Sequence, residues 1–222
     1  MIERKFVNQR MKEFRIQEFI AGTLKDVGYS HAKLVRTPLG EKIIIFASRP
    51  GLVVGRKGQN ISTLTRLVKK KFDLENPQIE ISEVDDVNLD AQIVAEKICS
   101  TLERYGSKRF KGVMHQAMEN TLKAGALGIE IILSGKVPGA RAKSWRVNGG
   151  YLKKCGDIAQ TQVKKAYAIA KLKSGVIGVK VSLMPPNIRL PDDIRLLEKP
   201  IIEEAKEEKK NEEQGNIAAG SA

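Results

Sequence analysis

The stretch LVVGRKGQNISTL, residues 52–64, places Gly55 and Gly58 three positions apart, between an apolar turn and the start of a helix. Glycine lets the backbone approach a phosphodiester without a clash from a Cβ atom. A helix that begins directly after such a loop presents free N–H groups and the positive end of its dipole, which favour an anion. Arg56 and Lys57 add positive charge at the same place. The stretch therefore predicts a site for the phosphate backbone of a nucleic acid.

The segments on either side of this loop complete a recognisable order. Apolar periodicity predicts a helix over residues 1–28, single or bent, and then a hairpin of two strands, 30–37 and 41–48. A helix follows the loop as far as residue 72, and a third strand holds Ile79 and Ile81. This order resembles a type II K-homology domain, whose GxxG loop clamps the backbone of about four nucleotides. A tight turn with solvated charges, or a loop that docks on folded RNA, is the alternative interpretation.

The polar segment 83–88 is the expected boundary of a second unit. The elements expected after it are helices at 89–105 and 109–124 and strands at 129–134, 140–147, 162–172 and 177–183. Separate runs of helices and strands are typical of an α+β fold. We therefore predict two α+β domains, 1–87 and 88–197, the second with two helices on a roughly four-stranded sheet. Residues 198–222 are expected to be a disordered charged tail, because they have too little apolar surface to fold alone.

The net charge of this 222-residue chain is +13, from 39 Lys and Arg against 26 Asp and Glu. Residues 1–87 hold 16 basic and 11 acidic residues, a net +5, whereas residues 88–197 hold 19 and 8, a net +11. The tail has seven acids and four lysines, a net −3. Such a surplus of positive charge indicates a polyanion as partner, most simply a nucleic acid. Because the surplus is larger in residues 88–197, we expect more of the phosphate contacts in the second unit. Charge that serves solubility alone is the simpler alternative.

Composition and spacing exclude several classes of protein. With 41% hydrophobic residues the chain can bury a core, but no apolar run is long enough to span a membrane. The charged start lacks the apolar region of a secretory signal, so cytoplasmic localisation is expected. Cys99 and Cys155 are too far apart for a zinc knuckle. His31 and His115 lack metal-like partners, and no nucleotide-hydrolysis or serine-hydrolase loop is present. We therefore expect no catalytic residues, no metal and no cofactor.

Four stretches together resemble one family, the third protein of the small ribosomal subunit in its archaeal and eukaryotic form. They are MIERKFVNQRMKEFRIQEF (1–19), LVVGRKGQNISTL (52–64), GIEIILSGKVPGARAKSWRVNGG (128–150) and SGVIGVKVSLMPP (174–186). The resemblance spans about residues 1–190 in order. It implies a structural constituent of the head of the small subunit, in which the chain binds ribosomal RNA and contacts neighbouring head proteins. It also implies a place at the channel where messenger RNA enters.

The resemblance directs attention to the predicted helix 109–124. In bacterial members of the family, basic residues of this helix help to open structured messenger RNA, and the matching positions here are Lys111, Gly112 and His115. Only Lys111 keeps a strong charge, so the sequence departs from the bacterial pattern. Lys108, Lys111 and His115 nevertheless share one polar face by their i, i+3, i+7 spacing, and Arg109 lies beside them. A basic face towards a single strand is predicted, with a merely solvated face as the alternative.

Two further basic groups are candidates for RNA contact. The first group consists of Lys136, Arg141, Lys143, Arg146, Lys153 and Lys154, named here the basic ribbon. Arg141 and Lys143 are expected to project from one side of a strand and to bridge phosphates, while Trp145 is expected to pack rather than to stack on a base. The second group, Arg66, Lys69 and Lys70, ends the helix after the GxxG loop. Cations at a helix C-terminus are also favoured by the helix dipole. Contact with RNA and simple exposure to solvent are therefore equally supported interpretations of this group.

Two alternatives come from other functional classes. A free K-homology regulator would bind short single-stranded RNA outside the ribosome. A nucleic-acid enzyme would be either a nuclease or a lyase on damaged DNA, and the lyase would need a lysine amine with a lowered pKa. The sequence contains many lysines and selects none of them, so the structural ribosomal protein is the preferred prediction.

Overall fold

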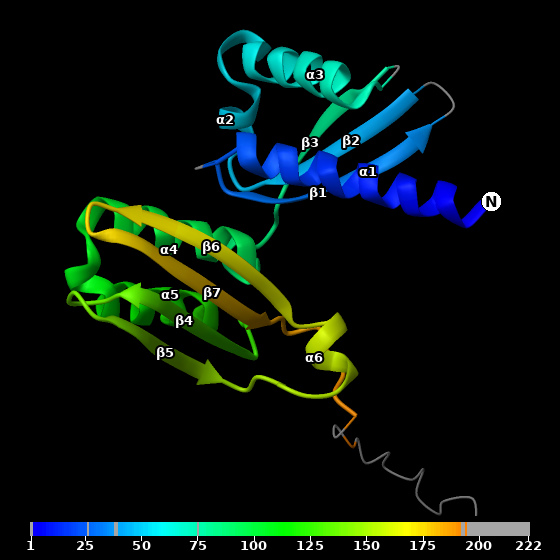
Figure 1. The fold of residues 1–222 in the computed structure, drawn as a ribbon. Helices are drawn as coiled ribbons and strands as arrows, with labels where there is room; N and C mark the ends of the chain where they lie inside the picture. The colour runs from blue at the N-terminus through cyan, green and yellow to red at the C-terminus, as the bar shows by residue number, and fades with distance from the viewer. Residues whose placement is uncertain (1, 26, 38–39, 75, 192–193, 195–222) are drawn as a thin grey trace, which may run out of the picture. The chain divides into compact units, whose positions relative to one another are not determined.

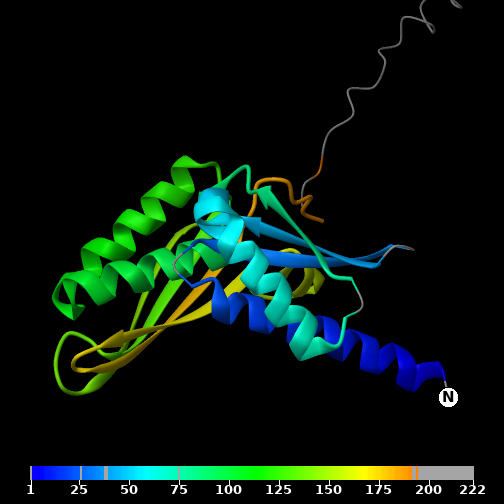
Figure 2. The same cartoon turned by 90° about the horizontal axis from the view of Figure 1, so that it is seen from above.

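The structure is a computed structural model that describes residues 2–25, 27–37, 40–74, 76–191 and 194. Its strands form one sheet of three strands and one of four, and each sheet has a hydrophobic core of its own. Figures 1 and 2 show the elements from two directions. The predicted acidic tail, 198–222, lies outside the described residues.

The three-stranded sheet contains the hairpin that the sequence predicts. Strand β1, Tyr29–Thr37, pairs antiparallel with β2, Gly40–Ala47, and β2 pairs parallel with β3, Gln78–Glu83. Ile43, Ile45 and Ala47 are buried at alternate positions of β2, because successive side chains of a strand point to opposite faces. They share a core with Ile16, Ile20, Leu64 and Val68 of two helices. The α+β character of this half is thus confirmed.

Helix α1, Ile2–Thr23, is a single helix and ends earlier than Gly28, where the sequence predicted its stop. The apolar stripe continues beyond the helix because Leu24 remains buried, and its N–H still reaches the Ile20 carbonyl at 2.9 Å. Both views show the first turns of α1 extending past α3. Phe6 and Phe14 of α1 are exposed.

The GxxG loop lies between two helices, as predicted. Helix α2, Pro50–Val54, precedes it, the 3-10 turn η1 covers Arg56–Gly58, and helix α3 spans Gln59–Phe72. Leu64 and Val68 anchor α3 in the core, which leaves its charged side in solvent. The N-terminus of α3 is therefore fixed directly beside the loop.

The four-stranded sheet has the strand order β5-β4-β7-β6, with every neighbouring pair antiparallel. Its strands are β4, Gly128–Lys136; β5, Ala142–Gly150; β6, Lys164–Leu172; and β7, Gly175–Met184. Helices α4, Ala91–Tyr105, and α5, Phe110–Lys123, cover one face of this sheet (Figure 1). The prediction of two helices on a four-stranded sheet is confirmed.

Two local predictions for this half differ from the structure. Strand β5 begins at Ala142, so Arg141 precedes the strand in which it was expected. A short helix, α6, Asp157–Thr161, was not predicted. Its five residues bury only Ala159, which is too little apolar periodicity for a helical signal. The other short turns are η2, Val87–Leu89, and η3, Ser107–Arg109.

Candidate nucleic-acid interface

The GxxG loop has backbone angles that explain its glycines. Gly55 has φ +70° with ψ −177°, and Gly58 has φ +73° with ψ 14°. A side chain rarely adopts either conformation, and a Cβ at Gly55 would also collide with the side chain of Asn60. The Asn60 amide instead donates to the Leu52 carbonyl at 3.3 Å and ties the loop to α2. The glycines are thus required by the shape of the loop.

This geometry leaves a shallow hollow beside the loop. The hollow has a volume of about 500 Å³ and is lined by Gly51, Leu52, Gly55, Arg56, Gln59 and Asn60. Gly58 provides no side chain to cap α3, and the first N–H of the helix, that of Gln59, donates to the Arg56 carbonyl. The positive end of the helix dipole still lies beside the loop. Arg56 and Lys57 are both exposed. The loop combines a helix N-terminus, positive charge and close backbone access, all of which favour a phosphate.

The basic end of α3 is exposed on the side of the helix opposite its buried residues. Arg66, Lys69 and Lys70 all face solvent. Lys71 differs from them, since its Nζ lies 4.1 Å from the centroid of the Phe19 ring. At 1.5 Å rise per residue, these cations lie roughly 10–17 Å along α3 from its first residue, Gln59. One strand of nucleic acid along α3 would meet both groups.

The predicted basic face at α5 is assembled from two elements. Lys108 and Arg109 belong to η3, and Lys111 and His115 to the first turns of α5. All four side chains are exposed. The opposite side of α5 buries Phe110, Met114 and Thr121. Lys111 and His115 share one side of α5 by their i, i+4 spacing, and we name the four exposed residues the α5 basic face.

Trp145 packs within the protein, as the sequence analysis preferred. Its indole N–H donates to the Val137 carbonyl at 3.0 Å, and its ring centroid lies 5.2 Å from that of Phe110. Lys111 Nζ lies 5.1 Å from the centroid of the Trp145 ring, a cation–π contact. The tryptophan thus joins β5 to the α5 basic face.

The basic ribbon does not form one surface. Lys143 shares its side of β5 with Trp145 and Val147, which pack against the helices, whereas Arg146 points to the other face of the sheet. Arg141 precedes the strand, and Ala142 and Ser144 are exposed rather than closely packed. The ribbon is divided because residues at odd and even positions of β5 face opposite sides.

Glu130 of β4 pairs with two members of the ribbon. Its Oε1 lies 3.1 Å from Arg146 Nε and 2.9 Å from Lys154 Nζ, and its side chain is only 10% exposed. The role of this carboxylate could not be predicted from sequence, because residue 130 is an ordinary polar position of an alternating strand. Within the described part of the chain, Lys136, Arg141 and Lys143 have no such acidic partner.

The face of the four-stranded sheet opposite the helices carries further candidates that the sequence analysis missed. Register places Tyr167 opposite Lys180, Lys180 opposite Ile132, and Ile132 opposite Arg146, in one row across the sheet. Tyr167 is 66% exposed, and Lys180 Nζ lies 5.4 Å from its ring centroid. Strand alternation identifies the residues of this face, but their arrangement in one row follows only from the strand order.

The groups considered for enzymatic chemistry are dispersed. Burial raises the pKa of the Cys99 thiol to about 12, and Cys155 is exposed in the segment after β5. His31 stacks on the Phe46 ring at 4.3 Å between centroids. Among the residues that the structure describes, no group of three His, Cys, Asp or Glu could hold a metal ion. No described helix is long and apolar enough to cross a membrane.

Comparison with known protein families gives two matches that follow each other along the chain. Residues 15–90 match the KH domain, and residues 98–183 match the C-terminal domain of ribosomal protein S3. The first match contains the GxxG loop and α3, and the second contains the α5 basic face and the four strands of the larger sheet except the last residue of β7. Both groups of candidate residues thus lie in recognised domains.

Several archaeal relatives match nearly the whole chain, and each is named small ribosomal subunit protein uS3. The protein of Methanocaldococcus jannaschii is 45% identical over 198 residues, which cover 89% of this chain and 94% of the relative. That of Methanococcus maripaludis strain C5 is 43% identical over 197 residues, with coverages of 89% and 92%. That of Methanococcus aeolicus is 40% identical over 200 residues, with coverages of 90% and 95%. These names describe ribosomal proteins and not enzymes, and the chain belongs to the uS3 family of the small ribosomal subunit.

Proposed function

We propose that this chain is a structural constituent of the small-subunit head, where it binds ribosomal RNA and lies at the channel through which messenger RNA enters. Membership of the uS3 family over most of the chain supports the ribosomal location in the cytoplasm. The observation that carries the RNA contact is the exposure of separate groups of cations on fixed secondary structure. Neighbouring head proteins are its expected protein partners.

The proposed phosphate contacts fall into three groups. They are the loop and α3 (Gly55, Arg56, Lys57, Gly58, Arg66, Lys69, Lys70), the α5 basic face (Lys108, Arg109, Lys111, His115) and the basic ribbon (Lys136, Arg141, Lys143, Arg146, Lys153, Lys154). We assign the loop and the ribbon to folded ribosomal RNA and the α5 basic face to single-stranded messenger RNA. Contacts of this kind position a protein without reading sequence, so the affinity should fall steeply with salt.

The separate cores of the two sheets support the division into domains 1–87 and 88–197. In this proposal the K-homology domain supplies the loop contacts, and the second domain, with its larger net charge, supplies most of the others. Expression of residues 88–197 alone tests the division. A cooperative unfolding transition is expected, and a chain without one would contradict an independent second domain.

Sedimentation of cell extracts through a sucrose gradient tests the ribosomal location. The chain should travel with small subunits and whole ribosomes, whereas a free RNA regulator would remain in the light fractions. Replacement of Arg56 and Lys57 by Asp should reduce incorporation, and the same replacement of Arg4 and Lys5 on α1 is the matched control. Equal incorporation of both variants would show that the GxxG loop is not a ribosomal contact.

A further inference from the structure

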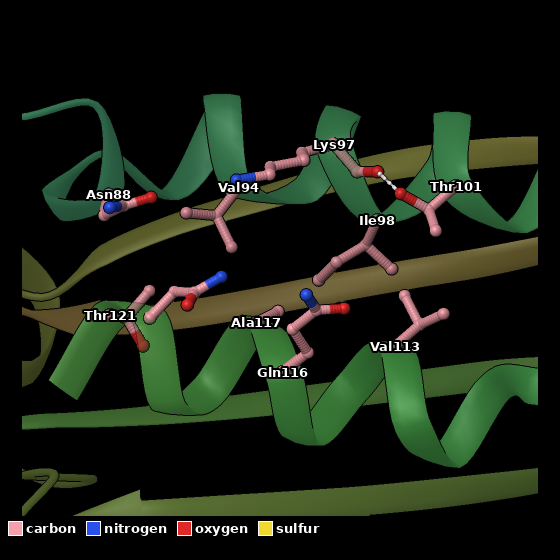
Figure 3. Close-up of a pocket in the computed structure, with 10 residues that line it drawn as sticks. Asn88, Val94, Lys97, Ile98, Thr101, Val113, Gln116, Ala117 and Thr121 are labelled. Carbon is pink, nitrogen blue, oxygen red and sulfur yellow. Dashed lines mark hydrogen bonds between the residues drawn. The ribbon is translucent and has the colours of Figure 1, made fainter. Parts of the chain in front are cut away.

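Strands β6 and β7 present a surface that none of the three groups of contacts proposed above includes. Helices α4 and α5 cover the other side of these strands, and Figure 3 shows Ile98 of α4 and Val113 of α5 in the space between the two helices. Ala170 and Ile177 are buried beneath the helices. Because successive side chains of a strand alternate, the residues at the intervening positions point to the uncovered side. They are Lys165, Tyr167, Ile169 and Lys171 of β6 with Val176 and Lys180 of β7, which we name the β6–β7 outer face.

The middle of this face is apolar and exposed. Tyr167 is 66% exposed, Ile169 65% and Val176 59%. Pairing places Ile169 opposite Gly178, where an added Cβ would meet only the Ser134 carbonyl oxygen, at 3.8 Å. The surface beside the tyrosine and the isoleucine is therefore low and open. Adjoining exposed apolar side chains mark a site of interaction, and the missing side chain at Gly178 leaves room for a flat ring.

Three lysines surround this apolar centre. Lys165 and Lys171 stand at the two ends of the outward row of β6, about 20 Å apart along the strand. Lys180 Nζ lies 5.4 Å from the centroid of the Tyr167 ring, a cation–π contact. A negatively charged partner that crosses the face would therefore meet a cation before the tyrosine, beside it and beyond it.

The same side of the sheet carries a single acid. Among the outward positions of the four strands, all of them described residues, that acid is Glu130 of β4. Its carboxylate is paired with Arg146 at 3.1 Å and with Lys154 at 2.9 Å. The outer face thus favours a polyanion over a partner with charges of both signs. RNA fits both of its features, because the phosphates are negative and unpaired bases stack on aromatic side chains.

We propose that the β6–β7 outer face binds an unpaired segment of RNA, with one base stacked on Tyr167 and the adjoining phosphates at Lys165, Lys171 and Lys180. The neighbouring base lies against Ile169. Contact of this kind accepts any base, since every base has a flat face. The inference rests on the proposed binding of RNA and adds a fourth surface to it.

Photo-crosslinking within assembled small subunits tests which partner covers this face. The full chain carries the photoreactive analogue benzoylphenylalanine in place of Ile169, an exposed position where a larger side chain leaves the core undisturbed. We expect an adduct with RNA that ribonuclease shortens. An adduct with protein alone would show that an acidic protein covers the face, and the absence of any adduct would show that nothing does. Either of these two results overturns the inference.

A fluorescent base tests the stacking on Tyr167. Emission of a fluorescent purine analogue in a short single-stranded RNA falls when the analogue stacks, so titration with the full chain reports stacking directly. Tyr167→Ser should reduce this quenching and weaken the affinity about tenfold, whereas Tyr167→Phe should retain both. Tyr105→Ser, at a similarly exposed tyrosine of α4, is the matched control. Equal behaviour of the Ser and Phe variants of Tyr167 would contradict the stacking.

Failure of the outer face can be distinguished from failure of the proposed function. If the wild-type chain neither enters small subunits nor binds RNA, the proposed function is wrong and this inference is wrong with it. If the wild-type chain does both and Tyr167→Ser matches it, only the outer face is wrong, and the three proposed groups of contacts remain.

Discussion

Lys154 Nζ lies 2.9 Å from Oε1 of Glu130, although 24 residues separate the two along the chain. Arg146 Nε reaches the same oxygen at 3.1 Å. The Glu130 side chain is 10% exposed, whereas those of the two cations are 59% and 58% exposed. One nearly buried carboxylate therefore depends on two cations that remain largely in solvent.

This arrangement predicts that the two cations act together on stability. Arg146→Ala or Lys154→Ala alone should reduce the free energy of unfolding by about 1 kcal/mol or less, because an exposed cation contributes little and the other one remains. The double variant should lose about 3 kcal/mol, since it leaves the Glu130 carboxylate with neither of these cations. Urea denaturation of the single and double variants measures the coupling.

Glu130→Gln in the background of the double variant is the control. It removes the buried charge and should recover much of the lost stability. Effects of the two single variants that add within about 0.5 kcal/mol would contradict the shared role of Glu130.

The two glycines of the GxxG loop should differ in their tolerance of alanine. Gly58 has the left-handed conformation, and a Cβ there meets nothing within 4 Å, so Gly58→Ala should cost about 1 kcal/mol. Gly55 has φ +70° with ψ −177° and faces Asn60, so Gly55→Ala should cost about 3 kcal/mol or more. Thermal unfolding measures both values. Equal losses would mean that the contact with Asn60 does not restrict position 55.

The α5 basic face can be tested through its salt dependence and through Trp145, which is the one tryptophan of the sequence. Replacing Lys108 and Lys111 by Gln should reduce the slope of log affinity against log salt by about 1.4 for a single strand. RNA binding should also change Trp145 emission, because Lys111 Nζ lies 5.1 Å from its ring. Fluorescence titration measures both, with Arg4→Gln and Lys5→Gln on α1 as the control pair. An unchanged slope would exclude this face as a phosphate site.

Local patterns predicted much of the fold because burial follows the period of each element. Ile177, Val179, Val181 and Leu183 alternate along the sequence and are all buried on one side of β7. Ala91, Ala95, Ile98 and Leu102 do the same at helical spacing in α4. The GxxG loop could also be predicted, because its glycines, its charges and the helix that follows are contiguous in sequence.

The remaining features depend on contacts between distant segments. The division of the basic ribbon requires the pairing of Ile132 with Arg146, which sets the face on which Arg146 meets Glu130. The predicted first helix was too long because Leu24 continues its apolar pattern. Leu24 is buried although it lies beyond the end of α1, and sequence alone does not distinguish such a residue from one more helical position.

The two cysteines should differ sharply in their reaction with a thiol reagent. Cys155 is exposed, so its thiol should react in the native protein, whereas burial raises the pKa of Cys99 to about 12 and removes both access and thiolate. A disulfide reagent that reports by absorbance should therefore label one thiol natively and the second only in denaturant. Cys155→Ser should abolish the native reaction and leave the denatured one. Rapid native labelling of Cys99 would instead show that α4 opens readily, and would return a reactive thiol to the candidates for covalent chemistry.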